Sequence, residues 1–238
     1  MKPKPVHQYQ NLGPKLLVFF FCGFLLSCNL TKDEMIVPNA AFHFIQLSPA
    51  APPLTIYVNN EKIAENFIYG EDSGYYEVQP GLISFKVSET GSNDFLIDNY
   101  TALTGGLKYS IFTVDSFSSI KLTSVRDNFI GLSGDTAGVR FLYMSADTAI
   151  LNVKLFNTRD SISYPSRYFN DQHADTTRAS FRKIRAGTFN LSLLQRDSTV
   201  YGFFDNINLE ANRFYTVYIK GFKKGTGADS LDKGIIRY

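Results

Sequence analysis

The stretch AFHFIQLS, at residues 41–48, recurs as GVRFLYMS at residues 138–145, and this repetition decides the expected fold. Three later stretches of the first half recur in the same order in the second half: TIYV (55–58) as NVKL (152–155), YEVQPGLISFKV (76–87) as RKIRAGTFNLSL (182–193), and LKYSIF (107–112) as RFYTVY (213–218). Self-similarity of this extent indicates that one structural unit occurs twice. We predict two domains, over residues 40–126 and 137–238, joined by a linker at residues 127–136.

The repeated unit has the pattern of β-strands. Ile83, Phe85 and Val87 alternate with polar residues, and alternate side chains of a strand share one face, which suits the inner face of a sheet. Phe, Tyr, Ile, Val and Thr are frequent, Gly, Asn, Asp and Pro separate the runs, and no long stretch has helical periodicity. The body of roughly 210 residues exceeds one sandwich of about 100 residues and suits two. The sequence therefore predicts an all-β protein of two tandem β-sandwiches.

The first 27 residues have the pattern of an export signal. Lys2, Lys4 and Lys15 are followed by the apolar run LLVFFFCGFLL at residues 16–26, and no acidic residue occurs among them. The run is too short for a membrane-spanning helix, which needs roughly 20 apolar residues, and fits the apolar region of a signal peptide. We therefore predict an exported protein with a signal peptide at residues 1–27.

The signal ends in LLSC, residues 25–28, which resembles the lipobox of bacterial lipoproteins. In that family the signal is cut before the cysteine, which then carries the lipid. The other cysteine, Cys22, leaves with the signal, so lipidation accounts for the single thiol that remains in an exported chain. The alternative is an ordinary signal peptide that contains a cysteine. We predict lipid attachment at Cys28, membrane contact through that anchor, and a tether over residues 28–39.

The tether contains NLTKDE at residues 29–34, in which a lysine is followed by two acidic residues. This pattern resembles the surface-export signal of lipoproteins in the Bacteroidetes. The alternative is a charged, solvated spacer. The resemblance implies an outer-membrane lipoprotein of the cell envelope that is exposed at the surface.

The charge of the chain changes once the signal is removed. Three of the 24 basic residues precede Cys28, leaving 21 basic against 22 acidic residues. The remaining chain is therefore close to neutral and has no basic excess to attract nucleic acid or anionic lipid. We expect no nucleic-acid partner.

Six motifs follow one another in the first repeat: AFHFIQLSP (41–49), Ala51-Pro52, IYVNN (56–60), Tyr69-Gly70, Ser73-Gly74-Tyr75 and Pro80-Gly81. This succession resembles the bacterial family catalogued as domain of unknown function 4397. Asn59-Asn60 stands where the family usually has an Asp-Gly turn, and still suits a tight turn. The resemblance is strong over residues 41–115 and weaker over residues 138–220. It implies an exported or surface-anchored β-sandwich of immunoglobulin-like or transthyretin-like build, often in tandem, with no established catalytic activity.

Candidate catalytic and metal-binding residues are few. Only His43 and His173 remain after the signal, and the body has no cysteine, so a zinc site would need residues from both repeats. His43 lies in a strand where the second repeat has Arg140, and we therefore expect a solvent-facing position. Ser73 lies in GEDSG, residues 70–74, which misses the G-x-S-x-G spacing and suits a turn. We predict no catalytic residue, no metal site and no cofactor.

The most individual segment is RDSISYPSRYFNDQHADTTR, residues 159–178, which is nine residues longer than its counterpart in the first repeat. Long loops on a β-scaffold often carry binding groups. Asp171, His173 and Asp175 alternate in this segment, with Tyr168 nearby. They could offer oxygen and nitrogen ligands, although the same composition describes a solvated loop. These four residues form the candidate ligand site.

A glycan could be a ligand of the protein or a modification of it. The chain has 14 tyrosines but no tryptophan, the usual platform for a sugar ring, and tyrosine in a sandwich is more often half-buried packing. Asp followed by Ser or Thr and then by an aliphatic residue or Thr occurs at Asp135, Asp147, Asp160, Asp175, Asp197 and Asp229. The pattern resembles the O-glycosylation motif of exported Bacteroidetes proteins, but these dipeptides are also ordinary turn formers.

The leading hypothesis is a non-enzymatic, lipid-anchored envelope protein. Its sandwiches would present loops to a glycan or an envelope protein, or serve as spacers. The hypothesis depends on the lipobox, on the internal repeat and on the lack of a recognisable nucleophile–base or metal motif in the sequence. The alternative is a hydrolase directed at envelope or other polysaccharides, with carboxylates that the sequence does not pair.

Overall fold

The computed structural model describes residues 37–238. The predicted signal peptide, the lipid-attachment residue Cys28 and the tether up to residue 36 lie outside the described residues. The first half contains eight strands: β1 (Ala40–Gln46), β2 (Leu54–Val58), β3 (Glu61–Phe67), β4 (Asp72–Val78), β5 (Gly81–Glu89), β6 (Phe95–Leu103), β7 (Lys108–Val114) and β8 (Lys121–Arg126). A 3-10 turn, η1 (Phe117–Ser119), precedes β8.

The second half contains eight further strands: β9 (Thr136–Tyr143), β10 (Leu151–Phe156), β11 (Ser161–Arg167), β12 (Arg182–Arg185), β13 (Gly187–Leu194), β14 (Val200–Leu209), β15 (Phe214–Lys220) and β16 (Asp232–Arg237). One helical turn, α1 (Asp171–Ala174), and the 3-10 turn η2 (Thr176–Ala179) lie between β11 and β12. A third 3-10 turn, η3 (Gly227–Asp229), precedes β16.

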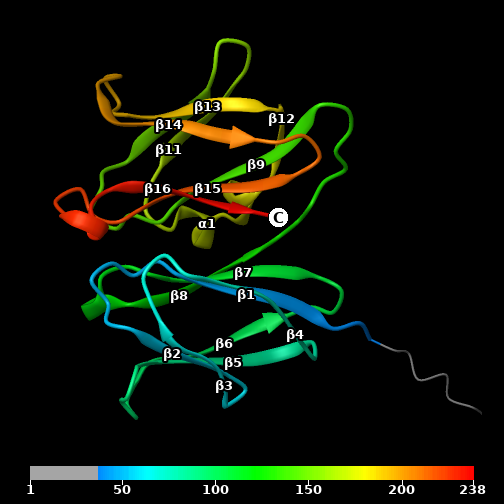
Figure 1. Ribbon diagram of the computed structural model, residues 1–238, viewed down its shortest axis with the longest axis vertical. Coiled ribbons are helices and arrows are strands. Elements are labelled where there is room, and N and C mark those ends of the chain that lie inside the picture. The colour runs from blue at the N-terminus through cyan, green and yellow to red at the C-terminus, as the bar shows by residue number, and fades with distance from the viewer. Residues whose placement is uncertain (1–36) are drawn as a thin grey trace, which may run out of the picture. The chain divides into compact units, whose positions relative to one another are not determined.

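The two halves have the same topology (Figure 1). Sheets β4-β1-β7-β8 and β3-β2-β5-β6 form the first sandwich, and sheets β12-β9-β15-β16 and β11-β10-β13-β14 form the second. The β1–β7 and β9–β15 pairs are parallel, and the other strand pairs are antiparallel. The predicted all-β fold with two tandem sandwiches is confirmed.

Each sandwich has its own core between its two sheets. In the first, Phe42 of β1 meets Phe85 of β5 edge to face, with ring centroids 5.2 Å apart. In the second, Phe141 of β9 packs on Tyr164 of β11 at 5.6 Å. Ile83 and Val87 are buried in the same core as Phe85, as their alternation predicts.

A third apolar cluster lies between the two sandwiches. It contains Ile45, Leu47, Phe112, Val114 and Val125 from the first sandwich and Leu142, Met144, Ala179, Tyr218 and Ile236 from the second. Strands β1 and β9 therefore bury one face in their own core and the other in this interface. A strand buried on both faces is apolar almost throughout, which is the pattern of AFHFIQLS and GVRFLYMS. The shared interface joins the two sandwiches more extensively than the linker does.

The expected solvent-facing position of His43 is wrong. His43 is 2% exposed and Arg140 is 0% exposed, because both side chains lie within the interface between the sandwiches. In the β1–β7 ladder His43 is opposite Ser110, and its Nε2 lies 2.7 Å from Ser110 Oγ. In the β9–β15 ladder Arg140 is opposite Thr216, and its Nε donates to Thr216 Oγ1 at 2.7 Å. The polar residue at this position belongs to a buried hydrogen-bond network, not to the solvated surface.

One residue from each sandwich, directly after its last strand, completes the network. Asp127 follows β8, and Tyr238 follows β16. Arg140 Nη2 donates to Asp127 Oδ1 at 2.5 Å and to Tyr238 OH at 2.9 Å. Burial opposes the charge of Arg140, but Tyr238 and Asp127 outweigh burial and raise the pKa of the guanidinium. Breaking such a buried pair is costly because one charge is left without its partner.

The interface is pseudo-symmetric. Residues at equivalent positions of the two sandwiches meet there: His43 and Arg140, Ser110 and Thr216, Asp127 and Tyr238, Ile45 and Leu142, Leu47 and Met144, Phe112 and Tyr218. Contact between equivalent faces is the arrangement of a two-fold symmetric dimer, here within one chain. The apolar positions are apolar in both repeats, whereas the polar positions differ. Arg140 of the second repeat bonds Ser110 and Asp127, and Tyr238 also bonds Ser110.

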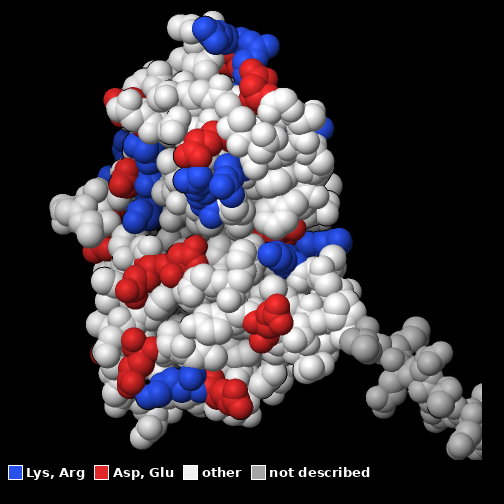
Figure 2. Space-filling model, turned by 45° about the vertical axis from the view of Figure 1, so that its right-hand side comes forward, with Lys and Arg blue, Asp and Glu red and all other residues white. Residues whose placement is uncertain are grey.

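The surface of the described residues carries charges of both signs. Basic and acidic side chains are interspersed on the face shown in Figure 2, so this face has no field of a single sign. Within residues 37–238, none of the helices combines the length and the apolar character that crossing a bilayer requires.

Candidate functional site

The 159–178 segment is folded around a buried ion pair. Arg167, at the end of β11, donates from Nε and Nη2 to the two carboxylate oxygens of Asp171 at 2.5 and 2.7 Å. Both side chains are buried, and Arg167 Nη1 also donates to the carbonyl of Phe141 on β9 at 3.1 Å. A bidentate pair of this kind fixes both distance and direction. The pair therefore holds α1 against the second sandwich.

Three of the four predicted site residues have separate places in this segment. Asp171 also accepts from Arg178 Nη1 at 3.0 Å, so its oxygens face the protein interior. Asp175 accepts from the hydroxyl and the backbone N–H of Thr177, and these bonds hold the pKa of Asp175 below its ordinary value. His173 is exposed on α1. Residues 37–238 contain no group of three or more His, Cys, Asp or Glu side chains arranged to hold a metal ion.

Tyr168, the fourth predicted residue, is 39% exposed and lines a groove of about 500 Å³. The groove is lined by Ile150, Leu151, Asn152, Ser166, Tyr168, Arg178 and Arg196. These residues come from the start of β10, the end of β11, η2 and the β13–β14 turn. The structure thus brings four separate parts of the second sandwich around the ring of Tyr168.

The groove is positively charged. None of its lining residues is acidic. Arg178 is balanced by Asp171 at 3.0 Å and by Asp175 at 3.6 Å. Arg196 is exposed on the β13–β14 turn, and within residues 37–238 its side chain has no acidic partner within ion-pair distance. A guanidinium without an acidic partner, in a groove that an aromatic ring also lines, is suited to a ligand that carries a carboxylate.

Sequence analysis missed most of this groove. The length of the 159–178 segment pointed to Tyr168, but Asn152 and Arg196 lie far from it in the sequence. Arg196 stands in an ordinary polar turn and has no local signal. Only the pairing of β10 with both β11 and β13 brings these residues together.

A Ser–His–Asp arrangement occurs within the interface network. Ser110 Oγ lies 2.7 Å from His43 Nε2, and His43 Nδ1 lies 2.9 Å from Asp72 Oδ1, which is the order of a hydrolase triad. Ser110 is 0% exposed, however, and its Oγ also bonds Asp127 at 2.7 Å and Arg140 at 3.1 Å. A nucleophile must reach a substrate, so this arrangement serves the interface rather than acyl transfer.

Two of the Asp-Ser and Asp-Thr motifs act as turn formers. Asp175 and Asp197 each accept the backbone N–H of the residue two positions later, Thr177 and Thr199. Aspartate favours turns because its side chain can bond nearby backbone in this way. Asp147 and Asp229 instead accept backbone N–H groups from the distant Lys223 and Ala50. O-glycosylation at these motifs stays a prediction.

The fold defines the chain as a tandem β-sandwich protein. Residues 40–154 match the family model described as Domain of unknown function (DUF4397). This match confirms the resemblance that the motifs of these residues indicate. The match covers the first sandwich and extends through β9 into β10 of the second.

No curated protein matches the chain. Among solved structures, it is similar to the tip fimbrial protein Mfa3 from Porphyromonas gingivalis with C-terminal truncation, at 9% identity and a TM-score of 0.26, covering 84% of this chain and 99% of the other. It is also similar to a candidate cell adhesion protein from Bacteroides uniformis, at 8% identity and a TM-score of 0.24, covering 84% and 98% of the two chains. At these scores the two likenesses carry no conclusion about function.

Proposed function

We propose that this protein is a non-enzymatic, lipid-anchored cell-envelope protein that binds an acidic glycan in the groove beside Tyr168. The anchor is Cys28, and the location is the outer membrane with the sandwiches at the cell surface. The observation that carries the proposal is the groove itself: an exposed aromatic ring and an unbalanced arginine line it, without an acidic residue.

The chemistry of the groove favours a sugar that bears a carboxylate. The ring of Tyr168 offers an apolar face for a sugar ring, and the side chains of Asn152 and Ser166 offer hydrogen-bonding groups for hydroxyls. The Arg196 guanidinium can bind a carboxylate through two parallel N–H donors. The volume of the groove, about 500 Å³, lies in the range of small-molecule sites, and more than one sugar ring fits such a space.

The test is a glycan array followed by calorimetric titration with the best acidic oligosaccharide. We expect Tyr168→Ala and Arg196→Ala each to weaken binding about tenfold or more, because each removes one main contact. Tyr100→Ala and Arg213→Ala are matched controls, since both residues are exposed and line none of the grooves described here. Equal losses in the test and control variants would refute the site.

The same oligosaccharides, incubated with the protein, test the non-enzymatic assignment. Binding without cleavage agrees with the proposal, whereas release of shorter products would establish the hydrolase alternative.

Anchoring has a separate test in cells. Radiolabelled palmitate should enter the wild-type protein and not the Cys28→Ala variant. A wild-type protein without label would refute the anchor, and protease accessibility on intact cells then reports whether the sandwiches face outward.

A further inference from the structure

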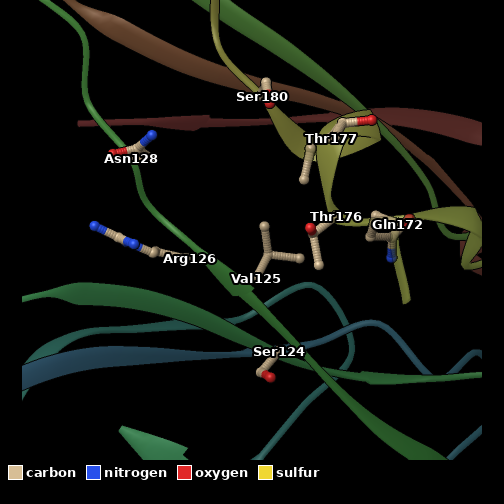
Figure 3. Close-up of a pocket in the computed structure, with 9 residues that line it drawn as sticks. Ser124, Val125, Arg126, Asn128, Gln172, Thr176, Thr177 and Ser180 are labelled. Carbon is tan, nitrogen blue, oxygen red and sulfur yellow. The ribbon is translucent and has the colours of Figure 1, made fainter. Parts of the chain in front are cut away.

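A second cavity, of about 250 Å³, lies between the two sandwiches. It is lined by Ser124, Val125, Arg126 and Asn128 from β8 and the segment after it, and by Gln172, Thr176, Thr177, Ala179 and Ser180 from the α1–η2 region. Figure 3 shows Arg126 and Asn128 on one side, Thr176, Thr177 and Ser180 on the other, and Val125 between them. This cavity shares no lining residue with the groove beside Tyr168.

One buried polar atom at this cavity has no partner. Gln172 is 2% exposed, and its Nε2 donates to Asn170 Oδ1 at 2.7 Å. Its Oε1 is buried and accepts no hydrogen bond from residues 37–238. A buried carbonyl without a donor is costly, so nearly all such groups in proteins have a partner. The wall of the cavity at Gln172 is therefore incompletely hydrogen-bonded, and Oε1 itself is not accessible from the cavity.

The cavity exists only where the two repeats differ. In the first sandwich β4 begins at Asp72 and pairs with β1 as far as Ile45, whereas in the second β12 begins at Arg182. The α1–η2 region occupies the space that the longer strand would fill. Its walls come from both sandwiches, and one of them is the α1–η2 region, which the first sandwich does not have.

The lining defines the ligand chemistry. Val125 and Ala179 are buried and form an apolar floor, while the rim carries hydroxyls, an amide and the guanidinium of Arg126. No acidic residue lines the cavity; Asp175, next to Thr176, is paired with Arg178. The volume lies below the roughly 300–1,000 Å³ of sites for drug-sized ligands, so the cavity fits one small ring.

We propose that this cavity is a second ligand site, which takes a single pyranose bearing a carboxylate, such as a uronic acid. The carboxylate binds Arg126, the sugar hydroxyls bond the side chains of Thr176 and Ser180, and the apolar face of the ring rests on Val125. The ligand contacts both sandwiches and therefore stabilises their association. Binding here does not depend on the groove beside Tyr168.

The test measures the thermal unfolding midpoint of the full chain in increasing glucuronate or galacturonate. A ligand that binds the folded state alone raises the midpoint in proportion to the logarithm of its concentration once the site is filled. We expect both uronates to raise it, and glucose or sodium acetate at the same concentrations to leave it within error. Glucose lacks the carboxylate and acetate lacks the hydroxyls, so an equal shift from either one would overturn the proposal.

Variants locate the binding. Arg126→Leu and Thr176→Val, both at exposed positions that tolerate substitution, should each weaken uronate binding about tenfold in a calorimetric titration, and Arg196→Ala should leave it unchanged. Loss with Arg196→Ala alone would assign the uronate to the Tyr168 groove and overturn this second site, while supporting the proposed function. A short oligogalacturonate tests the source of the ligand. Tighter binding than that of free galacturonate indicates the end of a polysaccharide, and weaker binding indicates a free monosaccharide.

Discussion

At the scale of single residues, the interface between the sandwiches depends on side chains that differ between equivalent positions. His43 and Arg140 occupy the same place in the two repeats, and so do Asp127 and Tyr238. One repeat supplies the carboxylate of Asp127, and the other supplies the guanidinium that neutralises it. Burial and the charge of Asp127 raise the pKa of Tyr75, so its phenol stays protonated and donates to Asp127 Oδ2 at 2.7 Å.

Arg140→Met should lower the free energy of unfolding by about 3–5 kcal/mol, because it leaves the Asp127 carboxylate buried without its charged partner. Urea unfolding followed by circular dichroism measures this change. The Arg140→Met, Asp127→Asn double variant should recover part of the loss, since the uncompensated charge is then removed.

The matched control is Arg237→Met. Arg237 pairs with Glu210 at 2.6 Å, but both side chains are about half exposed, so the loss should stay within about 1 kcal/mol. Similar losses for Arg140→Met and Arg237→Met would contradict the account of the buried pair.

Asp72 makes the stability of the protein depend on pH. Burial alone would raise the pKa of Asp72, but the hydrogen bond and charge of His43, with the backbone N–H of Gly74, bring it below the ordinary value of 3.8. As the pH falls, Asp72 takes up a proton in the unfolded chain before it does so in the folded protein. The stabilising contribution of Asp72 is therefore complete above the unfolded-state pKa of 3.8, and it is lost as the pH falls through the lower pKa of the folded state. The free energy of unfolding should therefore fall less steeply between about pH 5 and pH 3 in Asp72→Asn than in the wild type.

Denaturant titrations at a series of pH values measure that slope. Asp94→Asn is the control, because Asp94 is exposed and its carboxylate forms no ion pair within residues 37–238. An Asp72→Asn slope equal to that of the wild type would show that Asp72 is not responsible.

At the scale of elements, equivalent strands end in equivalent backbone conformations. The residue after β7 is Asp115, with φ at 73°, and the residue after β15 is Gly221, with φ at 77°. Ser48 Oγ donates to the carbonyl of Asp115 at 2.8 Å, and Ser145 Oγ donates to that of Gly221 at 2.6 Å. The two sandwiches share this geometry because β1 pairs in parallel with β7 and β9 with β15. Each serine hydroxyl forms its hydrogen bond at the end of one of these pairs.

Gly221→Ala should destabilise the protein by about 3 kcal/mol, because a Cβ there would lie against the carbonyl oxygen of Ser230 in a left-handed backbone. Gly134→Ala is the control. Gly134 also has a positive φ, 63°, but open space surrounds its Cβ position, so only the conformational cost of about 1 kcal/mol applies. Thermal unfolding of the two variants checks the difference, and equal losses would exclude the close approach as its cause.

At the scale of the whole molecule, residues 37–238 form one structural unit because a cluster of buried apolar side chains and a buried polar network join the two sandwiches. Leu142 and Phe112 are fully buried there, on the opposite strand faces from the two inner cores. Burial of large side chains couples the two sandwiches, since neither can unfold without exposing the apolar face of the other. The segment between β8 and β9 contributes Asp127 to this coupling.

Differential scanning calorimetry of the wild type should show one cooperative transition, despite the two sandwiches. Leu142→Asp places an unpaired carboxylate in the interface and should split the trace into two transitions or lower its midpoint strongly. Leu82→Asp, at a position 68% exposed, should keep the single transition. Two separate transitions in the wild type would contradict the coupling.

Local periodicity made the sandwiches predictable. Ile83, Phe85 and Val87 face one core because the pleat of a strand alternates side chains, whatever surrounds it. The four pairs of matching stretches predicted equivalent strands in the two sandwiches. The segment at 159–178 could be singled out by its length, but the inward direction of Asp171 and the presence of Arg196 in the same groove as Tyr168 could not be inferred.

The sequence by itself determined the strand pattern, the doubling of one sandwich and the family motifs, because these depend on neighbours along the chain. Only the tertiary structure decided that His43 and Arg140 are buried, that equivalent faces of the sandwiches meet, and that β8 and the α1–η2 region line a common cavity. A polar residue on the outer face of a sheet has the same local sequence pattern whether that face meets water or a second sandwich. The partners of such a residue lie far away in the sequence, so they can be identified only in the folded structure.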